Sequence, residues 1–174
     1  MKVFVVSSRF LIYLPISLLS SLKLIFRNKY VLIDLDYSLC RNNLGDNSFM
    51  FDYKNPNLKI NEELKKIINK YNISGFQNII FSSRGLRAKP FSRKWLKDNN
   101  INYSAFFHLG LTGLKIIPIF ISLILFKEFV LLDDLSNIKD KKLKKSFIYN
   151  FVELFLIFKR FKWLDPQRHN YENF

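Results

Sequence analysis

Residues 30–40 read "YVLIDLDYSLC", and this stretch decides the fold expected for the chain. The run 30–36 is apolar and rich in β-forming residues, which is typical of a strand buried on both faces of a sheet. It ends in Asp34 and Asp36, and Ser38 follows two residues later. Two carboxylates this close repel each other, so the pattern costs stability unless a cation or a reaction requires it.

Strand and helix patterns alternate in the sequence after this run. We expect strands at 76–83, 103–109 and 128–134, helices at 60–71, 87–99 and 113–126, and a loop or small flap over 39–58. Such alternation predicts an α/β fold, a three-layer Rossmann-like parallel sheet with helices on both faces. Sheets of this kind bind ligands at the carboxyl ends of their strands.

The chain divides into three segments by composition. Residues 29–145 form the expected core, 1–28 are an apolar N-terminal helical segment, and 146–174 are basic and aromatic. The N-terminal segment either packs on the core or lies on a membrane surface, because Pro15 and Lys23 make it a poor membrane span. Residues 139–164 fit either a final strand and helix or one long amphipathic helix.

The charge balance favours an anionic partner. The chain of 174 residues has 28 Lys and Arg against 14 Asp and Glu, a formal net charge of +14. Phosphate groups, nucleic acid and an acidic membrane surface are all partners of the right sign. Cys40 is the single cysteine, which excludes an internal disulfide and fits a reducing compartment. We therefore expect a cytoplasmic protein, either free or peripheral at the inner face of the membrane.

A second acidic pair ends the expected strand 128–134. If that strand neighbours the first one, Asp133 and Asp134 meet Asp34 and Asp36 at one edge of the sheet. Such a cluster would be strongly unfavourable without compensation. Mg²⁺ takes one or two carboxylates together with waters and substrate phosphate, so we expect Mg²⁺ at this edge.

Groups suited to binding phosphate fall at the same edge. Ser82 and Ser83 end the strand 76–83 and can donate hydrogen bonds to phosphate oxygens. Arg84 follows them, and Lys115 stands at the start of the helix 113–126, within reach of this edge. His108 ends the strand 103–109 and is expected near the rim, without a metal role.

Taken in order over residues 30–138, these groups resemble the four motifs of the haloacid dehalogenase superfamily of phosphotransferases, in its uncapped or minimally capped form. The first motif is an Asp-x-Asp-x-Thr/Ser after a strand, the second a Ser or Thr ending the next strand, the third a Lys at a helix start, and the fourth an acidic pair. The matching residues are Asp34, Asp36 and Ser38; Ser82 or Ser83; Lys115, with Lys89 and Lys94 as alternatives; and Asp133 with Asp134.

The resemblance implies a Mg²⁺-dependent phosphomonoester hydrolase with an aspartyl-phosphate intermediate. Asp34 would be the nucleophile and Asp36 the general acid and base, and a second Asp at the position of Asp36 points to phosphatase rather than dehalogenase chemistry. Ser82 and Lys115 would hold the phosphoryl oxygens as charge develops.

The remaining roles follow from the same resemblance. Mg²⁺ would bind Asp34, the backbone carbonyl of Asp36, and a carboxylate of Asp133 or Asp134. The resemblance also makes Ser38, Ser83 and Arg84 substrate-binding residues.

The intervals between the motifs leave no room for a cap domain, which implies an open site. Open sites in this superfamily serve large substrates or are closed by a neighbouring subunit, so a large, membrane-associated or sugar phosphate is expected, and an oligomer is possible. Two alternatives stay open. The basic run 82–103 also resembles uncapped phosphatase domains that process nucleic-acid ends, and the chain could instead be a non-catalytic, membrane-attached scaffold.

Overall fold

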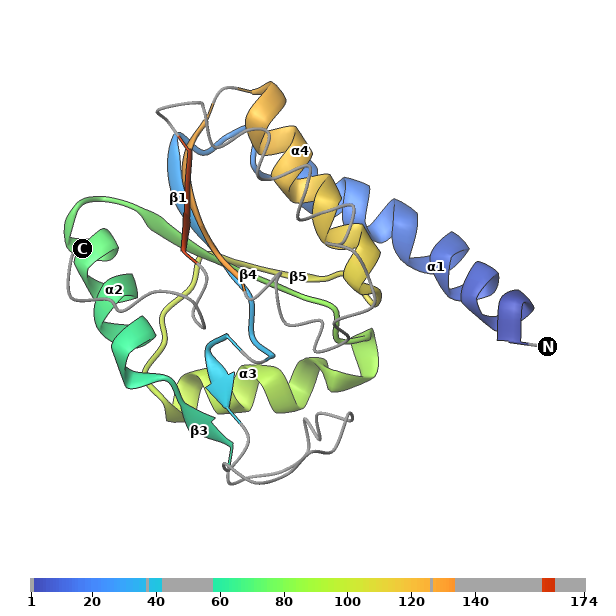
Figure 1. Ribbon diagram of the computed structural model, residues 1–174, viewed down its shortest axis with the longest axis horizontal. Coiled ribbons are helices and arrows are strands. Elements are labelled where there is room, and N and C mark those ends of the chain that lie inside the picture. Colours follow the sequence, from blue (N-terminus) through green and yellow to red (C-terminus); the bar gives the residue numbers. More distant parts are fainter. Residues whose placement is uncertain (1, 37, 42–57, 126, 134–160, 165–174) are drawn as a thin grey trace, which may run out of the picture.

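A five-stranded parallel sheet forms the centre of the fold, in a computed structural model that describes residues 2–36, 38–41, 58–125, 127–133 and 161–164 (Figure 1). The strand order is β5-β4-β1-β6-β7, so the first strand lies in the middle. The strands are β1 (Lys29–Ile33), β4 (Gln77–Ser82), β5 (Ala105–His108), β6 (Glu128–Leu132) and β7 (Phe161–Leu164). The expected strands at 30–36, 76–83, 103–109 and 128–134 are therefore present, each slightly shorter than expected.

Helices cover both faces of the sheet, which confirms the three-layer α/β prediction. Alternate residues of β1 point to opposite sides, so that Val31 and Ile33 belong to one apolar core and Tyr30 and Leu32 to the other. The helices α2 (Glu62–Ile73) and α3 (Lys89–Asp98) cover the first core, and α1 (Lys2–Leu22) and α4 (Ile116–Ile124) cover the second. Figure 1 shows the two pairs on opposite sides of the sheet.

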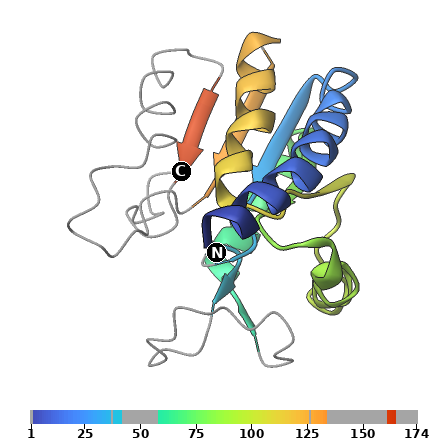
Figure 2. The ribbon, with the colours of Figure 1, turned by 90° about the vertical axis from the view of Figure 1, so that its right-hand side faces the viewer.

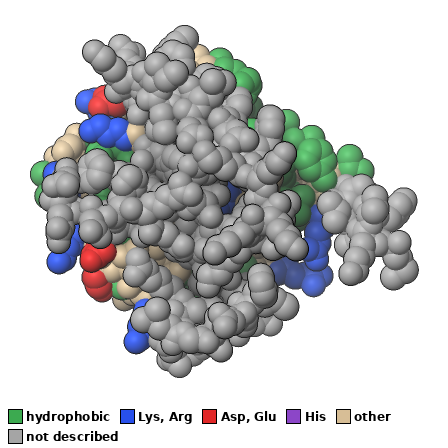
Figure 3. Space-filling model, viewed as in Figure 1, with side chains coloured by type: hydrophobic (Ala, Val, Ile, Leu, Met, Phe, Trp, Pro, Cys, Tyr) green, Lys and Arg blue, Asp and Glu red, His purple; other side chains and the backbone are tan. Residues whose placement is uncertain are grey.

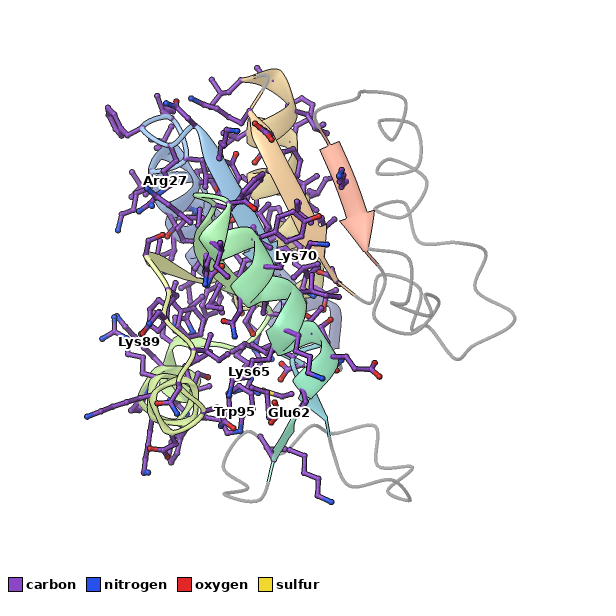
Figure 4. All side chains as sticks on the ribbon, turned by 90° about the vertical axis from the view of Figure 1, so that its left-hand side faces the viewer. Arg27, Glu62, Lys65, Lys70, Lys89 and Trp95 are labelled. Atoms are coloured by element: carbon purple, nitrogen blue, oxygen red, sulfur yellow. The ribbon has the colours of Figure 1, made fainter. Side chains whose placement is uncertain are left out.

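Local sequence signals explain where the helices α2 and α3 begin. The side chain of Asn61 caps α2 by accepting a hydrogen bond from the Leu64 amide at 3.3 Å, and two glutamates occupy the first turn. Pro90 stands in the first turn of α3, where its missing amide hydrogen costs nothing. Figure 4 views this side of the molecule, where Glu62 and Lys70 are exposed on α2 and Trp95 comes from α3.

The N-terminal helix α1 packs on the core, one of the two arrangements that the sequence left open. Tyr13 and Leu14 pack against the second core, and Ser17 and Ser21 on the same side are buried. Among the helices that the structure describes, none has the length and apolar content needed to cross a membrane. The opposite side of α1 carries exposed apolar residues.

Two smaller strands flank the expected flap. The pair β2 (Cys40–Arg41) and β3 (Lys59–Ile60) is antiparallel, with Cys40 opposite Ile60, and residues 42–57 between them lie outside the described residues. Near the end of the chain, β7 pairs with β6 in parallel, with Phe161 opposite Phe129 (Figure 2). The sheet therefore draws one strand from the segment 146–174; the rest of that segment lies outside the described residues.

Candidate active site

The strand order brings three predicted site residues to one edge of the sheet. Because β1 lies between β4 and β6, the residues that end these strands are neighbours. Asp34 continues the pairing beyond β1, since its amide donates a hydrogen bond to the carbonyl of Leu132 at 2.9 Å. Asp133 follows β6 directly and Ser82 is the last residue of β4. The expected meeting of Asp34, Ser82 and Asp133 at the carboxyl ends of the strands is thus observed.

Lys115 joins the two aspartates. Its Nζ lies 2.9 Å from Oδ2 of Asp34 and 3.0 Å from Oδ2 of Asp133. All three side chains are buried, with at most 5% of any of them exposed. Lys115 reaches this position because it ends the short helix η2 (Thr112–Lys115), directly before α4. Its Nζ also lies 5.5 Å above the ring of Phe81 on β4, a favourable cation–π arrangement.

The charges of this triad favour a further cation. Two carboxylates and one ammonium carry a net charge of −1, and a buried ion needs close partners of opposite sign. Asp34 and Asp133 are the described residues that fit Mg²⁺, which accepts one or two carboxylates beside waters and phosphate. Within the described residues, no three His, Cys, Asp or Glu side chains are grouped as a metal site, and Asp134 lies outside those residues.

Arg84 is bound to Asp36, the predicted acid and base. Its Nε and Nη2 donate hydrogen bonds to Oδ1 of Asp36 at 2.8 and 2.6 Å, and its Nη1 donates to Oγ of Ser92 at 2.8 Å. The guanidinium also lies 3.7 Å from Sγ of Cys40. Burial, the largest single influence, would lower the pKa of Arg84, but the charge and hydrogen bonds of Asp36, with smaller contributions from Cys40 and Asp34, together outweigh it and raise that pKa. The side chain expected to bind substrate therefore fixes the orientation of Asp36.

The serines of the predicted site are placed by the backbone around them. The Oγ of Ser82 accepts a hydrogen bond from the amide of Arg84 at 3.1 Å, which sets the turn that follows β4. Ser38 is buried, and its carbonyl accepts a hydrogen bond from the side chain of Asn61 at 3.3 Å. Ser83 is half-buried beside Ser82.

The two alternative lysines lie on α3, apart from the triad. Lys94 forms an exposed ion pair with Asp98 one turn later, at 2.6 Å. Lys89 begins α3, and its charge acts on the imidazole of His108 (Figure 4 labels Lys89). Of the three lysines considered for the third motif, Lys115 is the one that contacts both aspartates.

His108 lies at the same edge, opposite Ser82 in the pairing of β5 with β4. Its ring is buried and stacks on Phe106, with 3.9 Å between the ring centres. Burial, followed by the positive charges of Lys89, Arg93 and Arg84, lowers the pKa of His108 to about 4, although a backbone hydrogen bond with Arg84 acts in the opposite sense. The imidazole is therefore neutral at physiological pH.

Tyr13 of α1 also reaches the site edge, and sequence reasoning missed it. Its hydroxyl accepts a hydrogen bond from the Leu86 amide at 3.1 Å, just after the turn that contains Ser82 and Arg84. Its ring occupies the space beside Gly110, where an added Cβ would lie 2.3 Å from a ring carbon. A tyrosine within an apolar helical run is the one signal that the sequence offers, because tyrosine needs a polar partner for its hydroxyl.

Comparison with known proteins gives two similar structures. No protein-family model and no curated protein matches the sequence. A chain in "Structure of the Pnkp1/Rnl/Hen1 RNA repair complex" is similar at a TM-score of 0.48 with 22% identity, over 62% of this chain and 36% of that one. A chain in "Structure of Pnkp1/Rnl/Hen1 complex" gives 0.47 and 18%, over 60% and 38%. This chain therefore spans little more than a third of either relative.

Proposed function

We propose that this chain is a Mg²⁺-dependent phosphomonoester hydrolase of the haloacid dehalogenase type, acting through an aspartyl-phosphate on Asp34. The observation that supports this most is the buried bridge from Lys115 to Asp34 and Asp133. Those three residues come from separate segments, and each was assigned to a different motif of the resemblance. An ion triad placed at the ligand-binding edge of a parallel sheet is expected of a reaction site rather than of a core.

Asp34 and Asp133 are the residues that would hold the metal. When bound, Mg²⁺ would neutralise the charge between the incoming phosphate and these carboxylates. Lys115 already supplies one positive charge beside both. A dianionic phosphate is repelled by two carboxylates, so a positively charged surrounding is needed before Asp34 can approach phosphorus.

The reaction then proceeds in two successive displacements at phosphorus. In the first, a carboxylate oxygen of Asp34 forms a bond to phosphorus while the bond to the leaving oxygen breaks. Asp36 would enter this step protonated, with Arg84 still bound to its Oδ1, and would give its proton to the leaving oxygen. In the second, water attacks the same phosphorus, Asp36 takes the water proton, and the bond to Asp34 breaks. The products are the alcohol and inorganic phosphate, and both aspartates return to their initial states.

The remaining residues hold these groups in place. Arg84 and, through it, Ser92 fix Asp36 beside the nucleophile. Ser82 and Lys115 would bind the phosphoryl oxygens, whose charge grows as the reaction proceeds. The half-buried Ser83 is a further donor at the same edge.

The test is the release of phosphate from p-nitrophenyl phosphate in Mg²⁺. We expect Asp34→Asn to reduce the rate by more than about a thousandfold, since it removes the nucleophile. Asp98→Asn is the matched control, because Asp98 is an exposed aspartate on α3 whose partner is the exposed Lys94. Equal rates for wild type and Asp34→Asn would rule out the mechanism, and a folded wild type with no turnover would favour the scaffold alternative.

The substrate requires a second experiment. A panel of a sugar phosphate, a lipid phosphate and a 3′-phosphorylated oligonucleotide would be compared by kcat/KM at one salt concentration. The proposal favours the lipid or sugar phosphate. A clear preference for the oligonucleotide, weakened by added salt, would instead support an enzyme of nucleic-acid ends.

A further inference from the structure

The outer side of α1, the turn that follows it and the adjoining part of α4 form a surface rich in exposed apolar side chains. Here it is called the α1/α4 surface, and its exposed members are Phe10, Leu11, Ile12, Leu18, Leu19, Leu22, Ile25, Phe26, Phe120 and Ile124. Figure 3 shows hydrophobic side chains gathered on the side of the molecule where these two helices lie. Monomeric proteins rarely expose apolar side chains in such density, and a surface of this kind marks a site of interaction.

The exposed charges along the segments that carry this surface, 1–33 and 110–127, are mainly basic. Residues 1–33 contain five Lys and Arg and no Asp or Glu. Glu128, which follows the second segment, forms an ion pair with Lys29 at 3.0 Å, and Lys115 is buried in the triad. Arg9 and Lys23 are exposed on the first of these segments. Lys127 lies at the end of the surface, where its Nζ donates a hydrogen bond to the carbonyl of Ile25 at 3.0 Å. The face made by α2 differs, because it exposes Glu62 and Glu63 beside its lysines (Figure 4).

We propose that the α1/α4 surface docks on an anionic lipid bilayer. An apolar strip bordered by lysine and arginine matches the acyl boundary and the acidic headgroups of such a membrane. No described helix is able to cross a bilayer, which agrees with a helix lying in the interface plane. A second copy of the chain is the wrong partner, because each copy has a formal net charge of +14 and like charges repel.

The same helix connects the docked surface to the candidate active site. Tyr13, on the inner side of α1, binds the Leu86 amide and packs beside Gly110, while Leu11 and Ile12 next to it are exposed. In Figure 1 the N-terminal end of α1 extends past α4, away from the rest of the molecule. Docking would therefore bring the site to a phosphomonoester carried on a membrane lipid, a substrate class that rests on the proposed function.

Docking is tested by sedimentation with vesicles, a readout that needs no activity. Wild type should bind phosphatidylcholine vesicles containing phosphatidylglycerol, and bind pure phosphatidylcholine weakly. The variant Leu11→Glu/Leu19→Glu replaces side chains that are 71% and 67% exposed, and Phe26→Glu replaces one that is 89% exposed. Each should weaken binding by more than about tenfold. Ile73→Glu is the matched control, because Ile73 is 88% exposed on α2, and it should bind as wild type does.

Three results would overturn the docking proposal. The first is that wild type and Leu11→Glu/Leu19→Glu bind vesicles equally well. The second is that Ile73→Glu loses as much binding as the surface variants do. The third is that wild type is a dimer, Leu11→Glu/Leu19→Glu is a monomer, and neither protein binds vesicles. Circular dichroism melts establish that the variants are folded. All the replaced side chains are largely exposed, so the substitutions should leave the core intact.

The substrate class is tested separately with phosphatidate in vesicles and with p-nitrophenyl phosphate in solution. Leu11→Glu/Leu19→Glu should hydrolyse the soluble ester at the wild-type rate and lose activity on phosphatidate. If this variant loses activity equally on both substrates, or loses activity on neither, the link between docking and substrate is wrong. If no ester is hydrolysed while vesicle binding follows the prediction, the proposed function fails and the docking surface stands.

Discussion

Replacing Lys115 with methionine is the perturbation with the largest expected effect on stability. The substitution keeps most of the length of the side chain and removes the ammonium. Asp34 and Asp133, both buried and both within 3.0 Å of that ammonium, would then be two like charges without their shared counter-ion. Unpaired charges are costly in a buried, weakly polar environment. The free energy of unfolding should therefore decrease by far more than the contribution of one hydrogen bond.

The expected magnitude follows from this burial. Removing one partner of a buried ion pair typically costs about 3–5 kcal/mol, and Lys115 serves two partners. For a chain of this size each kcal/mol lowers the melting temperature by about 2–4 °C, so a decrease of about 6–20 °C is expected. By contrast, Lys94→Met breaks an exposed pair with Asp98 and should cost no more than about 0.5 kcal/mol.

The assay is urea unfolding followed by circular dichroism, with thermal melts beside it. A third variant, Lys115→Met/Asp133→Asn, keeps the apolar replacement and removes one of the two unpaired charges. It should be more stable than Lys115→Met alone, because the penalty comes from charge rather than from lost packing. This variant also preserves the test if Lys115→Met proves too unstable to purify.

Two results would refute this reasoning. In one, Lys115→Met unfolds at the same urea concentration as Lys94→Met, which would mean that the triad contributes no more than a surface pair. In the other, Lys115→Met/Asp133→Asn is less stable than Lys115→Met. The apolar contacts of the side chain, and not its charge, would then hold this edge of the sheet together.

Three further outcomes are expected. Asp36→Ala removes the carboxylate that pairs with the buried Arg84 and should lower the free energy of unfolding in urea by about 2 kcal/mol. This is less than for a fully buried pair, because Asp36 is partly exposed. A decrease below about 0.5 kcal/mol would contradict the role given to this pair. Gly110→Ala should destabilise by more than about 2 kcal/mol, since its φ is +71° and the new Cβ would meet a tyrosine ring, whereas Gly113→Ala has open space and should be near neutral in the same melts. His108 has a pKa near 6.5 in the unfolded chain and about 4 in the folded protein, so the unfolded state binds its proton first as the pH falls. The contribution of His108 to stability is therefore complete above pH 6.5 and is lost as the pH falls through 4. The free energy of unfolding of wild type should decrease by about 1–2 kcal/mol between about pH 7.5 and pH 5, and His108→Gln should not show this decrease.

The central strands, and the meeting of Asp34, Asp133 and Lys115 at one edge of the sheet, were predictable because their signals are local; the ion pairs between these residues were not predicted. A short apolar run that ends in aspartate identifies a buried strand and places its carboxylate at the ligand edge without knowledge of the neighbours. The strand order then brings Asp34, Ser82 and Asp133 together. The same reasoning selected Lys115 over Lys89 and Lys94, since it directly precedes the helix that leads into β6.

Other features depend on contacts between distant segments, and no pattern in the sequence specifies them. The orientation of Arg84 is set by Asp36, which is 48 residues away. Tyr13 meets Leu86 across 73 residues; its hydroxyl needs a polar partner, but the helical apolar run does not tell which loop supplies that partner. The side of α1 that faces the core was likewise unspecified, because polarity does not predict it: Ser17 and Ser21 are buried on that side, while the opposite side exposes apolar residues such as Leu11 and Leu19.

The most direct test of the account is whether phosphate becomes covalently attached to Asp34. Wild-type protein would be mixed with substrate and Mg²⁺, quenched in acid, cleaved with pepsin at low pH and examined by mass spectrometry over residues 30–41. The account predicts a phosphoryl group on Asp34 that appears within the first turnover and is absent from Asp98. Rapid turnover with no phosphoryl group on Asp34, or with the group on another residue, would contradict it.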